Sequence, residues 1–147
     1  FLGACITAVD RSPEALEVAA ENALRCGFSD RLTFHCGSWF EGLEHRRFDL
    51  ILANPPYLSE SEWGQTEPEV KLFEPREALV AGQNGLDDLK HILTHAIDHL
   101  NSGAMVALET SPRHHPELTA LAPCTGYGWV RSICDLAGNP RFFFARA

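Results

Sequence analysis

The chain has 147 residues and a formal net charge of -8, with 45% hydrophobic and 22% charged residues. This composition is typical of an ordinary globular protein and allows one domain with a sizeable core. The acidic balance argues against a general nucleic-acid binder, which needs a concentrated Lys/Arg surface. No apolar run approaches the roughly 18 residues of a membrane span, and no signal-peptide pattern opens the chain, so we expect a cytoplasmic protein without a membrane partner.

The cysteines are odd in number and form no Cys-x-x-Cys pair. The sequence therefore indicates neither a disulfide framework nor a zinc knuckle. We expect buried free thiols at all five positions. These are Cys5, Cys26, Cys36, Cys124 and Cys134.

Strand and helix signals alternate along the first third of the chain. Ser12 is a good N-cap, Pro13 fits the first helical position and Gly27 fits the stop. The apolar residues between them recur at helical spacing, so one face of this helix is expected to be buried. We predict strands at 5–9, 32–36 and 48–53, with the helix between the first two.

A long connection, 55–85, precedes the second half of the chain, and loops of this length tend to be functional. Apolar residues then recur at helical spacing from 86 to 100, which predicts a strongly amphipathic helix. Beyond it we predict a strand at 104–109, a short helix at 116–121 and an antiparallel strand pair at 129–134 and 141–145.

Strands that alternate with crossover helices predict an α/β fold with a mostly parallel sheet and an antiparallel C-terminal hairpin. Ligands of such sheets bind beyond the carboxyl ends of the strands. Asp10 directly follows the first predicted strand, where a carboxylate accepts hydrogen bonds from ribose hydroxyls, although an Asp before Arg-Ser-Pro also fits a simple turn. Ser38 and Trp39 follow the second strand, and Trp39 suits either an apolar wall for a purine or a partly buried core position.

The most informative motif is Asn54-Pro55-Pro56-Tyr57, directly after the third predicted strand. Because proline has no N–H and cannot continue a sheet ladder, the strand ends here with unpaired carbonyl groups. The Asn54 side-chain carbonyl and the Pro55 backbone carbonyl can each accept one N–H of a planar NH2 group, with the Tyr57 ring against its flat face. The motif predicts a site that aims the nitrogen of an amide or aromatic amine at an electrophile; a turn that only ends a strand is the alternative.

Several segments in chain order carry a family resemblance: Ala8-Val9-Asp10-Arg11-Ser12-Pro13, Gly37-Ser38-Trp39-Phe40, Phe48-Asp49-Leu50-Ile51, Asn54-Pro55-Pro56-Tyr57, Phe73-Glu74-Pro75-Arg76, Gly85-Leu86-Asp87 and Asp135-Leu136-Ala137-Gly138. Together they resemble the catalytic domain of the bacterial peptide chain release factor N5-glutamine methyltransferases, the HemK/PrmC family. The tetrad is shared with many amino-methyltransferases, whereas the Phe-Glu-Pro-Arg and Asp-Leu-Ala-Gly segments are not.

This resemblance implies a Rossmann-like class I S-adenosylmethionine-dependent methyltransferase. It implies methylation of the glutamine side-chain amide in the Gly-Gly-Gln motif of class I peptide chain release factors. In such a site Asp10 would hold the cofactor ribose, Ser38 and Trp39 would lie near its adenine, and Asn54 would lie beside the cofactor. The implied substrate-binding residues are Asn54, Pro55, Pro56 and Tyr57, and Asn54, Pro55 and Tyr57 among them are implied to be catalytic.

Two features depart from the family pattern. The family carries a Gly-rich loop after its first strand and an N-terminal helical domain, whereas this chain begins at Phe1-Leu2-Gly3, just before the second strand. We therefore expect 1–147 to be a partial methyltransferase catalytic domain, with the first strand and the Gly-rich loop missing and open edges on the neighbouring strands. Ser38 stands where an acidic residue is usual, which weakens cofactor binding by about 1 kcal/mol.

Three other functions stay open from the sequence. The same tetrad serves enzymes that methylate the exocyclic amine of a flipped-out nucleic-acid base, although the acidic balance and the Phe-Glu-Pro-Arg segment argue against nucleic acid as a direct partner. A glutamine methyltransferase can instead act on a ribosomal protein. The chain could also be a catalytically inactive fragment.

His91, His95 and His99 recur every four residues on the predicted helix at 86–100. This spacing is typical of metal ligands on one helix face. The face lies opposite the leucine stripe, and no Glu or Cys is placed to complete a site. We therefore predict a solvated polar face and no metal.

Overall fold

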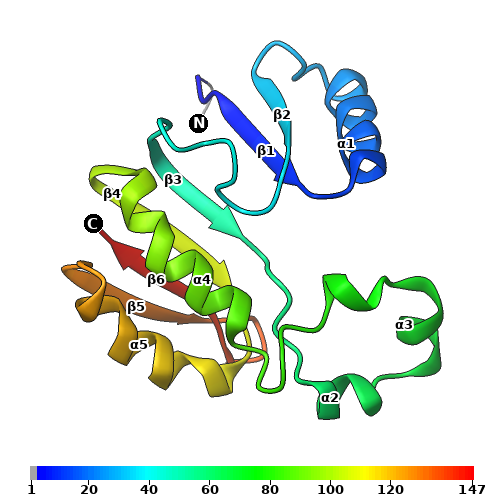
Figure 1. Cartoon of the computed structure of the whole chain (residues 1–147), viewed down its shortest axis with the longest axis vertical. Coiled ribbons are helices and arrows are strands. Elements are labelled where there is room, and N and C mark those ends of the chain that lie inside the picture. Colours follow the sequence, from blue (N-terminus) through cyan, green and yellow to red (C-terminus); the bar gives the residue numbers. More distant parts are fainter. Residues whose placement is uncertain (1–2) are drawn as a thin grey trace. The chain divides into compact units, whose positions relative to one another are not determined.

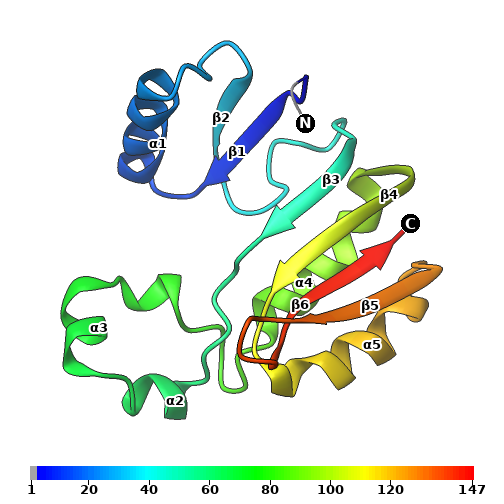
Figure 2. The same cartoon turned by 180° about the vertical axis from the view of Figure 1, so that it is seen from behind.

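The computed structural model describes residues 3–147. Phe1 and Leu2, which belong to the segment expected just before the second strand of the family pattern, lie outside the described residues. The chain divides into two compact units, Phe1–Glu44 and His45–Ala147. Figures 1 and 2 show their helices and strands from opposite sides. The α/β class predicted from the sequence is confirmed.

The first unit is a parallel strand pair connected through a helix. β1 (Ile6–Asp10) pairs with β2 (Leu32–Cys36), and the register places the last residues of the two strands opposite each other. The connecting helix is α1 (Pro13–Arg25). The strand predicted at 32–36 and the helix after Ser12 are confirmed, and β1 begins and ends one residue later than predicted.

Local signals define both ends of α1. The Ser12 Oγ accepts a hydrogen bond from the Ala15 N–H at 3.1 Å, and Pro13 occupies the first turn, where its missing N–H costs nothing. After the C-cap Cys26, Gly27 adopts a φ of 73°, a left-handed conformation that stops the helix. The predicted helix signals therefore act as expected.

We expect Ser12→Ala to lower the free energy of unfolding by about 1 kcal/mol, because the first turn of α1 loses its side-chain acceptor. Urea unfolding followed by circular dichroism measures this difference. Ser12→Asn keeps an acceptor and should stay near the wild type. Equal losses in the two variants would contradict the capping role.

The second unit contains a four-stranded sheet of mixed direction. Its strand order is β3-β4-β6-β5, with a parallel β3–β4 pair and antiparallel pairing in the rest. The predicted C-terminal hairpin is confirmed, and β4 begins earlier than predicted because Phe48 already pairs with Leu100 across a register shift. The strands are β3 (Phe48–Ala53), β4 (Leu100–Glu109), β5 (Trp129–Cys134) and β6 (Pro140–Arg146).

Two helices of this unit cover one face of its sheet. α4 (Asp87–Ala96) and α5 (His115–Cys124) lie in front of the strands in Figure 1 and behind them in Figure 2. Short 3-10 helices adjoin them, η2 (Ile97–His99) after α4 and η3 (Pro112–His114) before α5. The core between helices and sheet is apolar and almost completely buried, as expected for an amphipathic stripe on a sheet: Leu89, Ile92, Leu93, Val106, Leu108, Leu118, Phe143 and Ala145.

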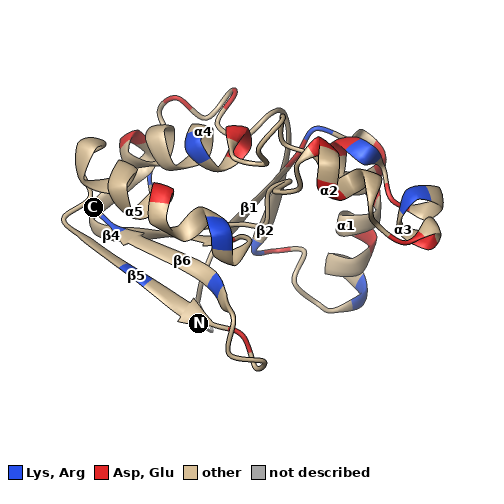
Figure 3. Ribbon diagram, turned by 90° about the horizontal axis from the view of Figure 1, so that it is seen from below, with Lys and Arg blue, Asp and Glu red and all other residues tan. Residues whose placement is uncertain are grey.

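The connection 55–85 belongs to the second unit and contains short helices that the sequence did not predict. They are α2 (Glu60–Gly64), α3 (Pro68–Phe73) and the 3-10 helix η1 (Arg76–Ala78). An isolated bridge between Leu58 and Val80 joins the two ends of the connection. Figure 3 shows acidic and basic residues together on its helices. The connection therefore leaves the end of β3, forms short helices and returns to pair with its own start, and is not an extended loop.

The strands β1 and β3 each have an open edge. Among the described residues β1 pairs only with β2, and β3 only with β4. These edges leave backbone N–H and C=O groups unpaired, and apolar side chains on the faces of the same strands are also exposed, Leu52 by 71% and Ile6 by 49%. The sequence predicts such open edges.

The prediction for His99 is wrong. His99 is 8% exposed, and its Nδ1 lies 3.1 Å from the Arg46 carbonyl oxygen. The reason is that α4 ends at Ala96, so the 3-10 turn of η2 rotates His99 out of the helical spacing shared by His91 and His95. Those two are exposed, with ring centroids 4.3 Å apart.

The predicted burial of the cysteines is also wrong. All five are free thiols, and all five are exposed. Cys26 caps a helix, while Cys36 and Cys134 end strands at the outer positions of their sheets. Positions at the ends of elements and at sheet edges leave a small side chain accessible whatever its hydrophobicity.

Candidate active site

The tetrad Asn54-Pro55-Pro56-Tyr57 leaves the sheet where β3 ends at Ala53. Pro55 is completely buried, which anchors the turn. The backbone N–H groups of Tyr57 and Leu58 both donate to the Leu79 carbonyl, at 3.2 and 2.9 Å. The turn is thus held at its start by the sheet and at its end by the returning connection.

The oxygens predicted to grip an NH2 group have no partner among the described residues. Asn54 is exposed, and its side-chain amide makes no hydrogen bond within residues 3–147. The Pro55 carbonyl oxygen likewise accepts none from this part of the chain. The exposed Asn54 amide is therefore available to a ligand, whereas the unpaired Pro55 carbonyl belongs to a buried residue.

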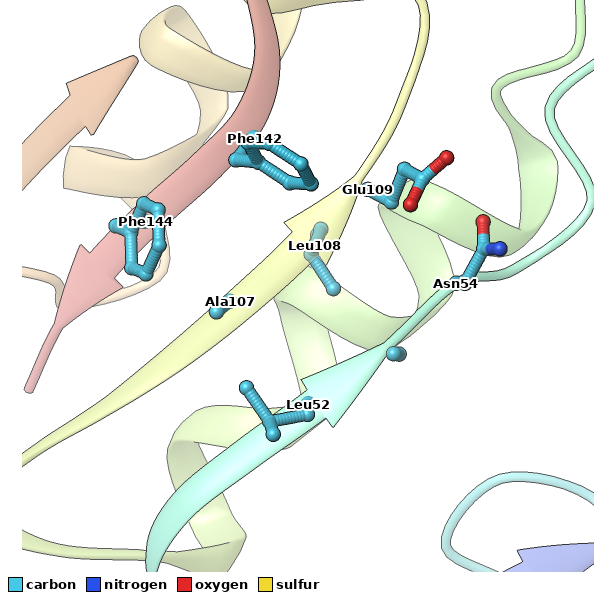
Figure 4. Close-up of a pocket in the computed structure, with 8 residues that line it drawn as sticks. Leu52, Asn54, Ala107, Leu108, Glu109, Phe142 and Phe144 are labelled. Atoms are coloured by element: carbon cyan, nitrogen blue, oxygen red, sulfur yellow. The ribbon is translucent and has the colours of Figure 1, made fainter. Parts of the chain in front are cut away.

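Asn54 lines an open pocket of about 310 Å³ at the carboxyl ends of β3 and β4. Ala53 pairs with Leu108, so Asn54 and Glu109 are the next residues of neighbouring strands, and Figure 4 shows the amide and the carboxylate beside each other. The other walls are apolar: Leu52, Ala53, Ala107, Leu108, Phe142 and Phe144. The volume lies at the lower end of the range of small-molecule sites. A pocket with the polar side chains of Asn54 and Glu109 and otherwise apolar walls suits a ligand with an amide or amine end.

The C-terminal hairpin contacts Tyr57. The Arg141 Nη1 lies 3.5 Å from the Tyr57 Oη, and the Arg141 Nε lies 3.5 Å from the Asp135 Oδ2. The Asp135 carboxylate also accepts hydrogen bonds from the N–H groups of Ala137 and Asn139, both at 2.9 Å. These bonds, the one from Asn139 first, lower the pKa of Asp135. Sequence reasoning did not identify Arg141, although the Asp-Leu-Ala-Gly segment precedes it.

The first unit brings together the other predicted site residues, Asp10, Ser38 and Trp39. The Gly37 N–H donates to the Asp10 carbonyl at 3.1 Å, so the ends of β1 and β2 lie against each other. The exposed Asp10 carboxylate accepts the Ser12 N–H through Oδ1 at 2.8 Å. This carboxylate therefore keeps Oδ2 available for a ligand hydroxyl.

Ser38 and Trp39 form the turn after β2. Trp39 is half-buried and has a φ of 52°, which a bulky residue rarely adopts. The Ser38 N–H donates to the Glu41 Oε2 at 3.2 Å. A carboxylate is thus present beside the position where the family pattern has an acidic residue, and sequence reasoning missed it.

His114 is a buried histidine behind the tetrad. Its Nδ1 lies 2.9 Å from the Thr110 Oγ1, and its Nε2 lies 2.9 Å from the Arg113 Nε and 3.2 Å from the Asn84 carbonyl oxygen. Burial, followed by the charge of Arg113, lowers the pKa of His114 below its ordinary value of 6.5. In the neutral ring Nε2 accepts from the Arg113 Nε, which can only donate, so it cannot also donate to the Asn84 carbonyl; Nδ1 is then the donor to the Thr110 hydroxyl.

We expect the free energy of unfolding to fall as the pH drops below 6.5, through the lowered folded-state pKa of His114. The unfolded chain binds a proton there at higher pH than the folded chain, so acidification favours unfolding. Burial acts in the same direction on His91 and His115. Urea unfolding of the wild type and of His114→Gln, measured above and below pH 6.5, gives the free energy of unfolding of each. The difference between the two proteins isolates the contribution of His114 to the pH dependence. A His114 NMR titration midpoint at or above 6.5 would contradict it.

Two further structural findings concern membranes and metals. Within residues 3–147 no helix is long and apolar enough to cross a membrane. The same residues contain no group of three or more His, Cys, Asp or Glu side chains arranged to hold a metal ion. The expectation of a metal-free protein stays a prediction.

Solved structures share this fold. A methyltransferase from Pyrococcus furiosus has a TM-score of 0.71 at 23% identity, covering 99% of this chain and 64% of that chain. A ribosomal protein L11 methylase from Lactobacillus delbrueckii subsp. bulgaricus has a TM-score of 0.63 at 16% identity, covering 97% of this chain and 57% of that one. The fold is that of the Rossmann-like methyltransferases.

The chain belongs to the methyltransferase domain family, whose model matches residues 2–123. Release factor glutamine methyltransferases of Gloeobacter violaceus and Cereibacter sphaeroides are each 40% identical to it, over 140 and 139 residues. These matches cover 95% of this chain but 49% and 50% of the two relatives. The chain thus spans about half the length of the curated relatives it matches. The resemblance inferred from the sequence motifs is confirmed.

Proposed function

We propose that this chain carries the catalytic site of an S-adenosylmethionine-dependent enzyme that methylates the N5 amide nitrogen of a glutamine in class I peptide chain release factors. The names of the relatives support this substrate. The single observation that carries the proposal is the pair of oxygens on Asn54 and Pro55, which lie after β3 without partners among the described residues. The expected location, the cytoplasm, follows from the proposed partner.

The proposed mechanism is mainly alignment. An amide nitrogen is a poor nucleophile because its lone pair is delocalised into the carbonyl. When bound, S-adenosylmethionine supplies an electrophilic methyl group on a sulfonium sulfur. Asn54 and the Pro55 carbonyl would accept the two N–H groups of the glutamine amide, with Pro56 and the Tyr57 ring against its plane. These bonds strengthen as the nitrogen becomes positive in the transition state, which lowers the barrier.

We propose that the first unit holds the nucleoside part of the cofactor. Asp10 would bind the ribose hydroxyls through its available Oδ2, and Trp39 would lie against the adenine with Ser38 near its edge. Asn54 would lie beside the reactive end of the cofactor. The uncommitted carboxylate oxygen and the strained tryptophan turn support this assignment, because strained backbone often marks ligand sites.

The test is incubation of the chain with methyl-labelled S-adenosylmethionine and a class I release factor, followed by mass spectrometry of the Gly-Gly-Gln peptide. We expect label on that glutamine and none on a release factor with alanine at this position. Label on ribosomal protein or on duplex DNA or RNA, but not on release factor, would replace the proposal with one of those substrates. Absence of methyl transfer together with absence of cofactor binding by calorimetry would identify an inactive fragment.

A further inference from the structure

Arg113, on η3, contacts the backbone of Tyr57, the last residue of the tetrad. Its Nη2 lies 3.4 Å from the Tyr57 carbonyl oxygen and 3.3 Å from the Asn84 carbonyl oxygen. The same guanidinium forms an ion pair with Glu62 of α2. Arg113 therefore joins three separate parts of the chain: the tetrad, the end of the connection and one of its helices. These three contacts all involve Nη2, and the Nε of the same guanidinium donates to the His114 Nε2, so the rigid planar group is held at two of its nitrogens.

The Tyr57 carbonyl is confined on a second side by Gly85. A Cβ atom added to Gly85 would lie 2.2 Å from the Tyr57 oxygen and 3.0 Å from the Arg113 Nη2. Only a residue without a side chain permits this approach, and Gly85 also has a φ of 70°. The Tyr57 carbonyl thus lies between a backbone and a cation.

Glu62 is itself held in place. Its Oε2 accepts hydrogen bonds from the N–H and the hydroxyl of Ser59, both at 2.8 Å, and Ser59 in turn accepts the Glu62 N–H. Burial acts to raise the pKa of Glu62, but the Ser59 hydrogen bonds and the charge of Arg113 outweigh it and lower the pKa. The carboxylate is therefore ionised at neutral pH and orients the guanidinium.

We propose that Arg113 is a positioning residue that fixes the Tyr57 carbonyl and, through it, the orientation of Asn54. The link between the two is stiff, because Pro55 and Pro56 between them have nearly fixed φ angles. A displacement at Tyr57 is consequently passed to the Asn54 amide instead of being absorbed by the chain. This role rests on the proposed function, in which Asn54 aligns the substrate nitrogen.

The test uses the fact that the chain has two tyrosines, Tyr57 and Tyr127. Tyr127 is buried, and its hydroxyl donates to the Leu93 carbonyl at 3.0 Å. In 19F NMR of the chain labelled with 3-fluorotyrosine, Arg113→Ala should shift and broaden the Tyr57 resonance and leave that of Tyr127 unchanged. Lys90→Ala is the matched control, because it removes an ion pair of similar exposure, Lys90–Glu117, and should move neither resonance.

Methyl-transfer kinetics give the second readout. Arg113→Ala should lower kcat about tenfold or more with little change in the KM for release factor, because a misplaced amide affects the chemical step. Arg113→Lys keeps the charge opposite Glu62 but has no fork of donors, and should recover only part of kcat.

The 19F readout needs no activity, so it tests Arg113 even if the chain methylates no release factor and the proposed function fails. A Tyr57 resonance unchanged in Arg113→Ala would overturn the positioning role. The same holds if both tyrosine resonances move together, which would indicate a general loss of packing.

Discussion

Asn54→Ala is expected to lower the rate of the proposed glutamine methylation by about 10²-fold or more, with the free energy of unfolding near that of the wild type. The fold should tolerate the change, because the Asn54 amide is exposed and bonds to nothing in residues 3–147. The reaction should not tolerate it, because one of the two acceptors that strengthen as the nitrogen becomes positive is lost. Single-turnover methyl transfer to a release factor and urea unfolding measure the two quantities separately.

Asn101→Ala is the control for this variant. Asn101 is also exposed, and its Nδ2 donates to the Asp49 Oδ1 at 2.8 Å, away from the pocket residues. It should retain the wild-type rate. Near-normal methylation by Asn54→Ala would remove Asn54 from the mechanism, whereas a large loss of stability would show that its role is structural.

Strands and helices with strong local signals could be predicted from the sequence. β2, β3 and β5 have the predicted bounds because each is a short apolar or β-branched run with clear breakers beside it. The helix α1 is equally clear, since its N-cap, its first-turn proline and the glycine beyond its end agree with its apolar period.

The helices of the connection could not be predicted in the same way. α2 and α3 have five and six residues and bury no side chain completely, so no apolar period marks them. A capping box at Ser59 and Glu62 begins α2, and that pattern is readable in the sequence. Short helices are held mainly by such local hydrogen bonds and by contacts with distant parts of the chain.

The site residues at the ends of strands could be predicted from the sequence, but the arginines that contact Tyr57 could not. Asp10 and Asn54 follow apolar runs, so their placement comes from chain order alone. Arg113 meets Tyr57 across 56 positions in the sequence, and Arg141 meets it across 84. No local spacing encodes such contacts, because they depend on how β4 and β6 pair in the sheet.

The pairing of β4 with β3 and β6 explains why the tetrad has support from several segments. β4 lies between these two strands, parallel to β3 and antiparallel to β6. The turn after β3, η3 after β4 and the turn before β6 therefore all lie at the same end of the strands. Arg113 on η3 and Arg141 at the start of β6 both contact Tyr57, which follows β3. The order of the strands in the sheet thus brings Arg113 and Arg141, which are far from Tyr57 in the sequence, into contact with it.

Gly85→Ala should affect both stability and activity, and Gly103→Ala separates the two causes. Both glycines belong to the second unit and have similar φ angles, 70° and 77°, so each alanine costs roughly 1–2 kcal/mol of backbone strain. Around Gly103 an added Cβ meets nothing within 4 Å, whereas at Gly85 it would lie 2.2 Å from the Tyr57 oxygen.

The backbone contact at Gly85 cannot be relieved by a side-chain rotation, so the tetrad has to move by roughly 1 Å, enough to cost about 10²-fold in rate. We therefore expect Gly85→Ala to lose most methyl transfer and to be less stable than Gly103→Ala, which should keep nearly full activity. Urea unfolding and single-turnover kinetics on the pair measure both effects. Equal activity in the two variants would show that the Tyr57 carbonyl is not confined by Gly85 in solution, and the stiff link from Tyr57 to Asn54 would then have no fixed end.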